Sequence, residues 1–335
     1  MSEEIPNGRY LDCLAVKFVL TGISVVDAVK SWFHDKKDVT EFLQLLEIDT
    51  DNPMDMAYLS DLHREAIDYL EDVLHYTVPL ECQSVNEIHD LFLMARHEET
   101  KLQTFACMIL KIMHIMFHIR GHEVVFNTPI SEAQLFQRLN NKTFAILDKM
   151  RTDGIGVVEF TSGKKSHTSL VTKLLAKREN LAAHIFDKMR FRVVLSNKKN
   201  LIQALIYLGR HLHPWNYVIP GQSQNNILSR GDLDSEFGPD IMDQVFGRED
   251  VLKNEQENEF SGQTYRVINF VVDIPLRIDD VAPQYTPAVA FAQTEIQLID
   301  SETAKLNSQG ENAHSHYKHR QLDRVRDRIQ ATLRV

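Results

Sequence analysis

One carboxylate stands among strand-forming residues near the C-terminal end of the sequence. Residues 291–299 read FAQTEIQLI, and alternation along a strand places Glu295 and Gln297 on one face and Ile296 on the other. A polar face of this kind is either solvated, as in many antiparallel sheets, or part of a functional site. The polar residues that precede and follow Glu295 decide between the two interpretations.

A basic stripe occurs earlier in the chain. Lys165, Ser169, Lys173 and Lys177 are spaced by four, so they share one face of a helix predicted to begin near Ser166. The unpaired amides at a helix N-terminus attract anions, and a polyphosphate would fit these side chains. The alternative interpretation is a solvated basic face.

A second carboxylate comes just before the predicted strand 191–195. Asp187 opens the segment DKMRFRVVL, which leads directly into that strand. A carboxylate at the mouth of a buried strand can hold Mg²⁺ against phosphates, because this hard cation takes one or two carboxylates together with phosphate oxygens and water. Asp187 is alternatively a helix cap or an ion-pair partner.

Two further polar segments complete the pattern. Tyr265 opens a predicted strand after a glycine turn at Gly262, where its ring either stacks on a base or packs against neighbouring side chains. Beyond Glu295, residues 310–318 read GENAHSHYK and place His314 and Lys318 four apart, on one face of a helix.

The periodicity of apolar residues changes near residue 150. Before it, segments such as 61–76, 85–96 and 100–119 show the spacing of amphipathic helices. After it, short β-rich runs alternate with helices, and a basic helix follows at the C-terminal end. The sequence therefore predicts an α+β fold, with a mostly α-helical domain of unknown role over 1–150 and a sheet domain flanked by helices over 151–335.

The elements of the second half follow from the same patterns. The predicted strands are 156–160, 191–195, 265–274 and 288–299, and the predicted helices are 166–177, 180–188 and 199–211. Residues 221–262, rich in Gly, Asn, Asp, Ser and Glu, are predicted to form a long polar surface insertion.

Composition limits the class of protein. The 335 residues are 43% apolar, which suffices for a sizeable core and for two domains. Three cysteines at unrelated spacings, a polar N-terminus and no apolar run of membrane-spanning length predict a reduced, cytoplasmic protein without a membrane segment. Residues 1–150 hold 13 Lys and Arg against 24 Asp and Glu, which argues against a broad nucleic-acid surface there.

The order of the polar segments resembles the synthetase domain of the RelA/SpoT family, the enzymes that make the alarmones (p)ppGpp. That family shows a basic helix, an Asp-x-x-Gly-x-Arg segment entering a strand, a Gly-Tyr-x-Ser-x-His strand, a Glu-Ile-Gln strand and Gly-x-x-Ala-His-x-x-Tyr-Lys. The resemblance covers residues 160–330 and rests on the order and spacing of these motifs. The matching residues are Lys165, Ser169, Lys173, Asp187, Arg192, Tyr265, Thr294, Glu295, Ile296, Gln297, Gly310, Ala313, His314, Tyr317 and Lys318.

The resemblance implies a nucleotidyltransferase-like mixed sheet and the Mg²⁺-dependent transfer of pyrophosphate from ATP to the 3′-hydroxyl of a nucleotide. It implies that Glu295 engages the acceptor hydroxyl as a base and that Asp187 and Glu295 hold the magnesium ion. The implied ATP and phosphate ligands are Lys164, Lys165, Ser169, Lys173 and Arg192. The implied acceptor ligands are Tyr265, Asn269, Gln297, His314 and Lys318.

The chain departs from the family at several positions. Gly163 stands where the family has an Arg that packs against adenine, so Lys164 would substitute for it. Arg190 replaces the glycine of Asp-x-x-Gly-x-Arg, and Asn269 replaces the histidine that follows the acceptor-stacking tyrosine. Because acceptor-side positions differ, the implied acceptor is GDP or GTP, or a variant such as an adenosine nucleotide or the 3′ end of tRNA.

The N-terminal half does not match the metal-dependent hydrolase domain of the long RelA/SpoT proteins. His89 and Asp90 form an HD pair, but the other members of that hydrolase pattern are not at convincing spacings. His114 and His118 lie four apart on an apolar helix, with His122 one turn later. These histidines either bind a metal, contact a nucleotide or a partner, or are satisfied within the core.

Two hypotheses follow from these patterns. The chain is an active pyrophosphokinase, a transferase that takes ATP and a nucleotide acceptor, or it is a catalytically inactive nucleotide-binding regulatory or interaction protein on the same fold. A toxin-like RNA modifier is a third hypothesis. A homo-oligomer is compatible with all three.

Overall fold

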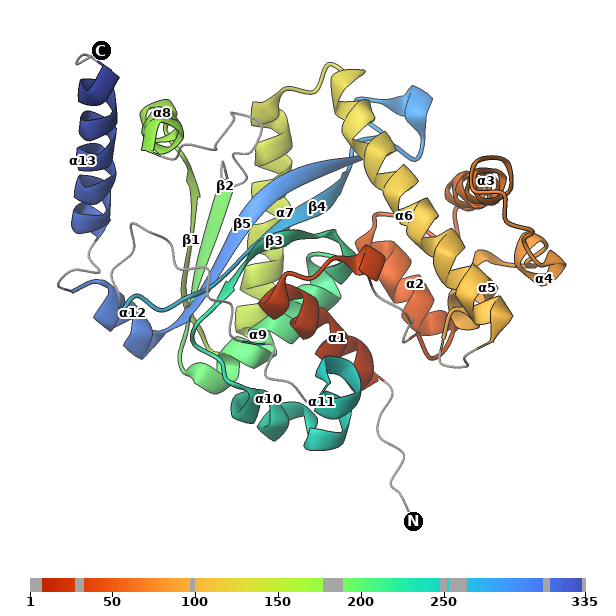
Figure 1. Ribbon diagram of the computed structural model, residues 1–335, viewed down its shortest axis with the longest axis horizontal. Coiled ribbons are helices and arrows are strands. Elements are labelled where there is room, and N and C mark those ends of the chain that lie inside the picture. Colours follow the sequence, from red (N-terminus) through yellow and green to blue (C-terminus); the bar gives the residue numbers. More distant parts are fainter. Residues whose placement is uncertain are drawn as a thin grey trace.

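Five strands of the computed structural model form one mixed sheet in the order β1-β2-β5-β4-β3 (Figure 1). β2 and β5 run parallel, and every other neighbouring pair is antiparallel. The strands are β1 (Val157–Lys164), β2 (Met189–Leu195), β3 (Val218–Asn225), β4 (Ile268–Arg277) and β5 (Val289–Asp300). The structure describes residues 8–27, 33–96, 100–176, 189–247, 252, 264–309 and 314–332.

Helices fill the N-terminal half, as the apolar periodicity predicts. They are α1 (Gly8–Thr21), α2 (Lys36–Leu45), α3 (Pro53–Asp68), α4 (Leu80–Gln83), α5 (Ile88–Met94), α6 (Lys101–Phe126) and α7 (Glu132–Thr152). The second half adds α8 (His167–Ala176), α9 (Lys198–His211), α10 (Arg230–Phe237), α11 (Pro239–Phe246), α12 (Ser301–Asn307) and α13 (His314–Thr332). The predicted α+β fold, with helices followed by a mixed sheet flanked by helices, is confirmed.

Alternation along the strands gives the sheet two different faces. On one face the large apolar side chains Phe191, Ile296 and Phe270 lie side by side in register across β2, β5 and β4. Phe144 of α7 contacts Phe191 with a ring separation of 6.0 Å. α7 runs behind the sheet in Figure 1 and covers this apolar face.

The opposite face carries a polar row that crosses the whole sheet. Arg192 of β2 lies opposite Gln297 of β5, and Gln297 lies opposite Asn269 of β4. Side chains in register share a face, so the row projects to one side of the sheet. From edge to edge it consists of Thr161, Arg192, Gln297, Asn269 and Gln224.

The 26-residue helix α6 covers one end of this second face. Phe291, on the same side of β5 as Glu295, contacts the rings of Phe117 and His118. A Cβ at Gly121 would lie 2.4 Å from the Phe291 ring, so only glycine permits this close approach. α6 is long and apolar enough to cross a membrane by length and composition alone, but here it packs between α3 and β5.

The predicted elements of the second half are found with shifted ends. β4 begins at Ile268, so Tyr265 lies in the segment before the strand and not within it. β3 was not predicted, because VIPGQSQN contains a proline and a glycine and lacks an apolar alternation. The predicted helix 180–188 lies outside the described residues.

Residues 221–262 hold more structure than the surface insertion that the sequence predicts. α10 and α11 fall within this range and bury Phe237, Ile241 and Phe246. Gly238, with φ 86°, ends α10 and precedes α11. Each helix has only eight residues and lies in a segment rich in Gly, Asn, Asp, Ser and Glu, which is why the sequence pattern missed them.

The helical half and the sheet share one hydrophobic core, which includes Phe18 of α1, Ile109 of α6 and Phe270 of β4. A buried ion pair also joins them. The carboxylate of Asp55 on α3 is fully buried and accepts two hydrogen bonds, of 2.7 and 2.9 Å, from the guanidinium of Arg277 at the end of β4. This bidentate geometry fixes α3 against the sheet.

We predict that Asp55→Ala lowers the free energy of unfolding by about 1.5–3 kcal/mol, because it removes the charge-assisted hydrogen bonds to Arg277, which keeps its ion pair with Asp279. Asp280→Ala is the control, since Asp280 is an exposed partner of Arg138 and its loss should cost about 1 kcal/mol or less. Urea unfolding followed by circular dichroism measures both values. Equal losses for the two variants would contradict the importance of the buried pair.

Candidate active site on one face of the sheet

Glu295 lies in the middle of the sheet and not on a solvated surface. It is on β5, between β2 and β4, and its residue exposure is 6%. Ile296 on the opposite side of the strand is buried in the apolar core. A carboxylate in this setting needs hydrogen bonds or an opposite charge, so the solvated interpretation of this strand is excluded.

The opposite charge comes from Arg190. The parallel register of β2 and β5 places Arg190 directly across from Glu295, and its Nε–H donates to Glu295 Oε2. The other carboxylate oxygen accepts a hydrogen bond of 3.3 Å from Gln297 Nε2. Both oxygens of Glu295 are therefore held by side chains of the same sheet face.

The polar row adjoins this ion pair. Arg192 is exposed, whereas Gln297 and Asn269 are half-buried. The side-chain oxygen of Asn269 is itself buried and has no hydrogen-bond partner within the described part of the chain. Because buried acceptors are almost always satisfied, Asn269 is suited to receive a donor from a bound molecule.

Tyr265 joins the same face from the segment before β4. Its ring packs against the small cluster formed by Val194, Val267 and Ile299. Burial raises the pKa of the Tyr265 phenol, and the positive charges of Arg192 and Arg190 oppose that rise. The phenol is thus neutral near pH 7 and close to both guanidinium groups. We call Arg190, Arg192, Tyr265, Asn269, Glu295 and Gln297 the polar face.

The predicted phosphate-binding helix α8 starts beside this face. β1 ends at Lys164, and its Gly163 lies opposite Arg190, so the helix that follows begins at the Arg190 end of the sheet. Ser166 Oγ accepts a hydrogen bond from the amide of Ser169 and lies 2.9 Å from Ser169 Oγ. Lys165 and Lys173 are half-buried near and within this helix.

Lys164 and Lys318 are not brought together with Glu295. Lys164 projects to the α7 side of the sheet, where its Nζ lies 3.2 Å from Glu132 Oε2 and 4.7 Å from the centre of the Phe136 ring. Lys318 is exposed on α13, a helix that packs against α8 through Val325 and Ala176. Asp187 and the side chain of His314 lie outside the described residues.

The polar face fits a magnesium ion on one condition. Mg²⁺ prefers one or two carboxylates together with phosphate oxygens and water, and Glu295 supplies one such carboxylate. Arg190 holds that carboxylate here, so a magnesium ion fits once Arg190 turns away. Asp187, the second predicted magnesium ligand, lies outside the described residues.

The predicted histidines take separate places in the helical half. His89 Nε2 lies 3.0 Å from Thr40 Oγ1. His114 accepts a hydrogen bond of 3.0 Å from Asn216 Nδ2, and burial lowers its pKa to about 3. It lines an apolar cavity of about 110 Å³, whose wall of Phe, Leu and Trp side chains does not suit phosphates. His118 contacts the sheet and is discussed below.

Arg190 is the residue of the polar face that the motifs did not identify. It appeared as a departure at a glycine position, and only the register with β5 shows that it faces Glu295. Thr161 and Gln224, the two ends of the polar row, were not identified either, because each lies on an edge strand whose pairing the sequence does not specify. Spacing alone carries one signal, since Arg190 and Arg192 are two apart and must share a strand face.

No protein-family model and no curated protein sequence matches the chain. Several solved structures are similar to the chain. The chain is similar to the small alarmone synthetase 1 from Bacillus subtilis bound to its product pppGpp, with 13% identity, a TM-score of 0.34, and coverage of 60% of this chain and 86% of that chain.

Two further solved structures are similar to the chain. One is the small alarmone synthetase 2 from B. subtilis, with 15% identity, a TM-score of 0.30, and coverage of 58% and 91%. The other is a GTP pyrophosphokinase family protein from Streptococcus pneumoniae, with 14% identity, a TM-score of 0.30, and coverage of 59% and 84%. These are proteins of the kind that the motifs resemble.

We predict that Arg192→Ala weakens the binding of inorganic pyrophosphate by about tenfold or more, because it removes a charge-assisted hydrogen bond from the polar face. Lys164→Ala is the matched control, and it should leave the dissociation constant unchanged because Lys164 projects to the α7 side. Isothermal titration calorimetry measures both constants. A larger loss for Lys164→Ala than for Arg192→Ala would show that the anion binds elsewhere.

Proposed function

We propose that the chain is a Mg²⁺-dependent nucleotide pyrophosphokinase, which transfers pyrophosphate from ATP to the 3′-hydroxyl of a nucleotide acceptor. The observation that carries the proposal is the buried carboxylate of Glu295 on a polar face that also holds Arg190 and Arg192. A base beside two guanidinium groups suits a reaction that joins a hydroxyl to a polyphosphate. The order of the sequence motifs supports the same reaction.

The proposed reaction is an in-line displacement at the β-phosphorus of ATP. The acceptor hydroxyl oxygen forms a bond to that phosphorus, the bond to the oxygen that bridges the α- and β-phosphates breaks, and AMP leaves with that oxygen. Glu295 accepts the proton of the attacking hydroxyl, which requires that Arg190 first release the carboxylate. Catalysis is otherwise positioning and neutralisation of charge.

Three members of the polar face bind the substrates in the proposed reaction. Arg192, with the α8 residues Lys165, Ser169 and Lys173, binds the phosphates of ATP. Tyr265 stacks on the acceptor base, and the unsatisfied oxygen of Asn269 accepts a hydrogen bond from the acceptor.

Magnesium and the acceptor complete the proposal. When bound, magnesium supplies neutralisation of the phosphate charge, and Glu295 with Asp187 would hold it. The acceptor is a guanosine nucleotide or a variant such as an adenosine nucleotide or the tRNA 3′ end.

The Arg190–Glu295 ion pair also favours a second candidate function. A guanidinium that occupies the base blocks both proton transfer and metal binding as long as it stays in place. The chain would then bind nucleotides on the polar face without turning them over. The two candidates differ in whether AMP is released and in whether Glu295 is needed.

We predict that the protein, incubated with Mg²⁺, ATP and each of GDP, GTP, AMP, ADP and deacylated tRNA, forms AMP and a pyrophosphorylated acceptor with at least one of them. Glu295→Gln should lower the rate by about 10²–10⁴-fold, because it removes the base while keeping the shape of the side chain. Anion-exchange chromatography of the nucleotides, and gel analysis of the tRNA, measure the products.

Glu159→Gln is the matched control for this experiment. Glu159 is an exposed carboxylate on β1 of the same sheet, opposite Val194 and away from Glu295, so its loss should not change the rate. If no acceptor yields AMP and Glu295→Gln binds an ATP analogue as tightly as the unchanged protein, the enzyme proposal is wrong and the binding protein is the better account.

We predict that Arg190→Ala tightens the binding of Mn²⁺ to the complex of the protein with a non-hydrolysable ATP analogue by about tenfold or more. Mn²⁺ serves here as a paramagnetic substitute for Mg²⁺. The reason is that the substitution removes a positive charge that competes for Glu295. The loss of the free Mn²⁺ signal in electron paramagnetic resonance measures the affinity. Arg138→Ala on α7 is the control and should have no effect. Unchanged or weaker Mn²⁺ binding by Arg190→Ala would show that Glu295 is not a metal ligand.

A further inference from the structure

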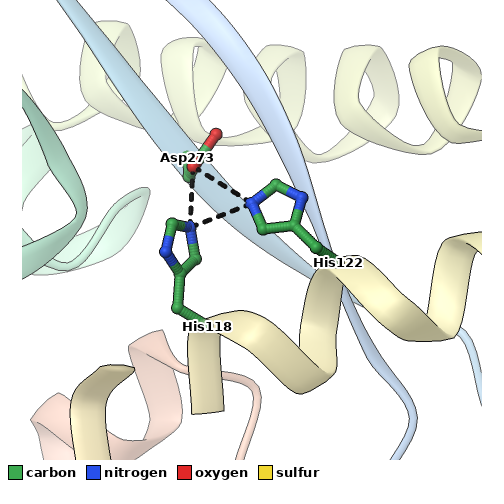
Figure 2. A group of neighbouring side chains, drawn as sticks. All are labelled: His118, His122 and Asp273. Carbon is green, nitrogen blue, oxygen red and sulfur yellow. Dashed lines mark hydrogen bonds and ion pairs between the residues drawn. The ribbon is translucent and has the colours of Figure 1, made fainter. Parts of the chain in front are cut away.

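A second cluster of polar side chains joins α6 to β4. His118 and His122 are four apart on α6 and point toward Asp273 of β4 (Figure 2). His118 Nε2 lies 2.8 Å from Asp273 Oδ2, His122 Nε2 lies 3.1 Å from His118 Nε2, and His122 Nε2 lies 3.6 Å from Asp273 Oδ2. Three atoms with lone pairs therefore converge on one point.

Hydrogen bonds alone leave the contact between His118 and His122 weak. A neutral imidazole nitrogen is either a donor or an acceptor, never both. If His118 Nε2 carries a proton and donates it to Asp273, it has no lone pair to accept from His122. If it accepts from His122, its lone pair faces the carboxylate of Asp273. A single N–H shared by both neighbours would bond weakly to each, whereas a cation between the three atoms serves all of them.

The separations match those between ligands of one metal ion. Zinc lies about 2.0–2.1 Å from histidine nitrogens and about 2.0–2.2 Å from carboxylate oxygens, so two ligands at tetrahedral angles are about 3.3 Å apart. The three observed distances of 2.8, 3.1 and 3.6 Å bracket this value. Histidines at i and i+4 of a helix are a common metal-binding arrangement, because both side chains project from one helix face.

The surroundings of the cluster also favour a cation. Asp273 is 1% exposed, lies within the apolar strand INFVVDIPLR, and its Oδ1 has no hydrogen-bond partner among the residues that the structure describes. A carboxylate that is buried this deeply needs hydrogen bonds or an opposite charge, and a cation held between Asp273 and the two histidines would supply the charge. The side chains of His118 and His122 are 29% and 46% exposed, so the fourth side of the cluster is open to water or to another ligand.

We propose that His118, His122 and Asp273 form a binding site for a divalent transition metal, with Zn²⁺ as the ion that the donor set fits best. Two imidazoles and one carboxylate suit zinc and its neighbours, whereas Mg²⁺ prefers oxygen ligands alone. Three protein ligands with an open fourth position are the pattern of zinc sites that bind a water molecule or a substrate atom. The metal cross-links the N-terminal helical half to the sheet.

The site lies next to the polar face but does not depend on its proposed function. Glu295 is in register with Val271, and Asp273 is two residues further along β4 on the same side. Diagonal neighbours of this kind are about 7–8 Å apart. The ion would thus hold α6 at the edge of the polar face, while Glu295→Gln should leave metal binding intact.

The test is a titration of the full chain, freed of metal by a chelator, with Zn²⁺ alone and with Co²⁺ alone. We expect one ion per chain and, with Co²⁺, the visible absorption bands of a four-coordinate site. His122→Ala should weaken binding by about 100-fold or more, since even residues that only orient metal ligands change affinity by about 10–100-fold. His34→Ala is the matched control, because the side chain of His34 is also 46% exposed. The His34→Ala variant should bind the metal as tightly as the unchanged protein.

A further variant separates ligation from a structural role. His122→Cys should keep the Co²⁺ site and add a thiolate-to-cobalt charge-transfer band in the near ultraviolet, which a packing residue would not produce. Because His122 is half-exposed, both of its variants should keep the fold, and circular dichroism confirms this. The proposal is overturned if the unchanged protein binds no stoichiometric ion, or if folded His122→Ala binds Zn²⁺ as tightly as His34→Ala.

Discussion

The parallel pairing of β2 with β5 is the constraint on which the rest of the site depends. It sets Arg190 across from Glu295 and Arg192 across from Gln297, while Phe191 meets Ile296 on the other face. Side chains alternate along a strand, so a slip of one residue in either strand would turn one set of these polar groups into the apolar core. The burial of Phe191 and Ile296 on one face therefore fixes the charged residues on the other face.

The helical half completes the site and is not merely attached to it. α7 covers the apolar face of the sheet, and α6 closes one end of the polar face through Phe291. Asp55 binds Arg277 at the end of β4, which fixes α3 in place. The His118 cluster holds α6 to the same strand.

Much of the fold followed from periodicity, whereas contacts between distant residues did not. The strand with Glu295 and the helix after Lys165 were predicted with ends within a few residues, because apolar alternation and spacing by four are local signals. Arg190 and Asp273 were not identified, because their roles depend on pairing across the sheet and on packing of α6. Lys164 was assigned to ATP, although the alternation that aligns it with Phe160 places it on the α7 side.

We propose that phosphates bind on the polar face of this sheet. A crystal structure with a non-hydrolysable ATP analogue, magnesium and an acceptor nucleotide tests it most directly. We expect the β-phosphate to lie within hydrogen-bond distance of Arg192, the acceptor hydroxyl to point at Glu295, and Arg190 to have turned from the carboxylate. An analogue bound near Lys164 on the α7 side, or in the apolar cavity beside His114, would contradict it.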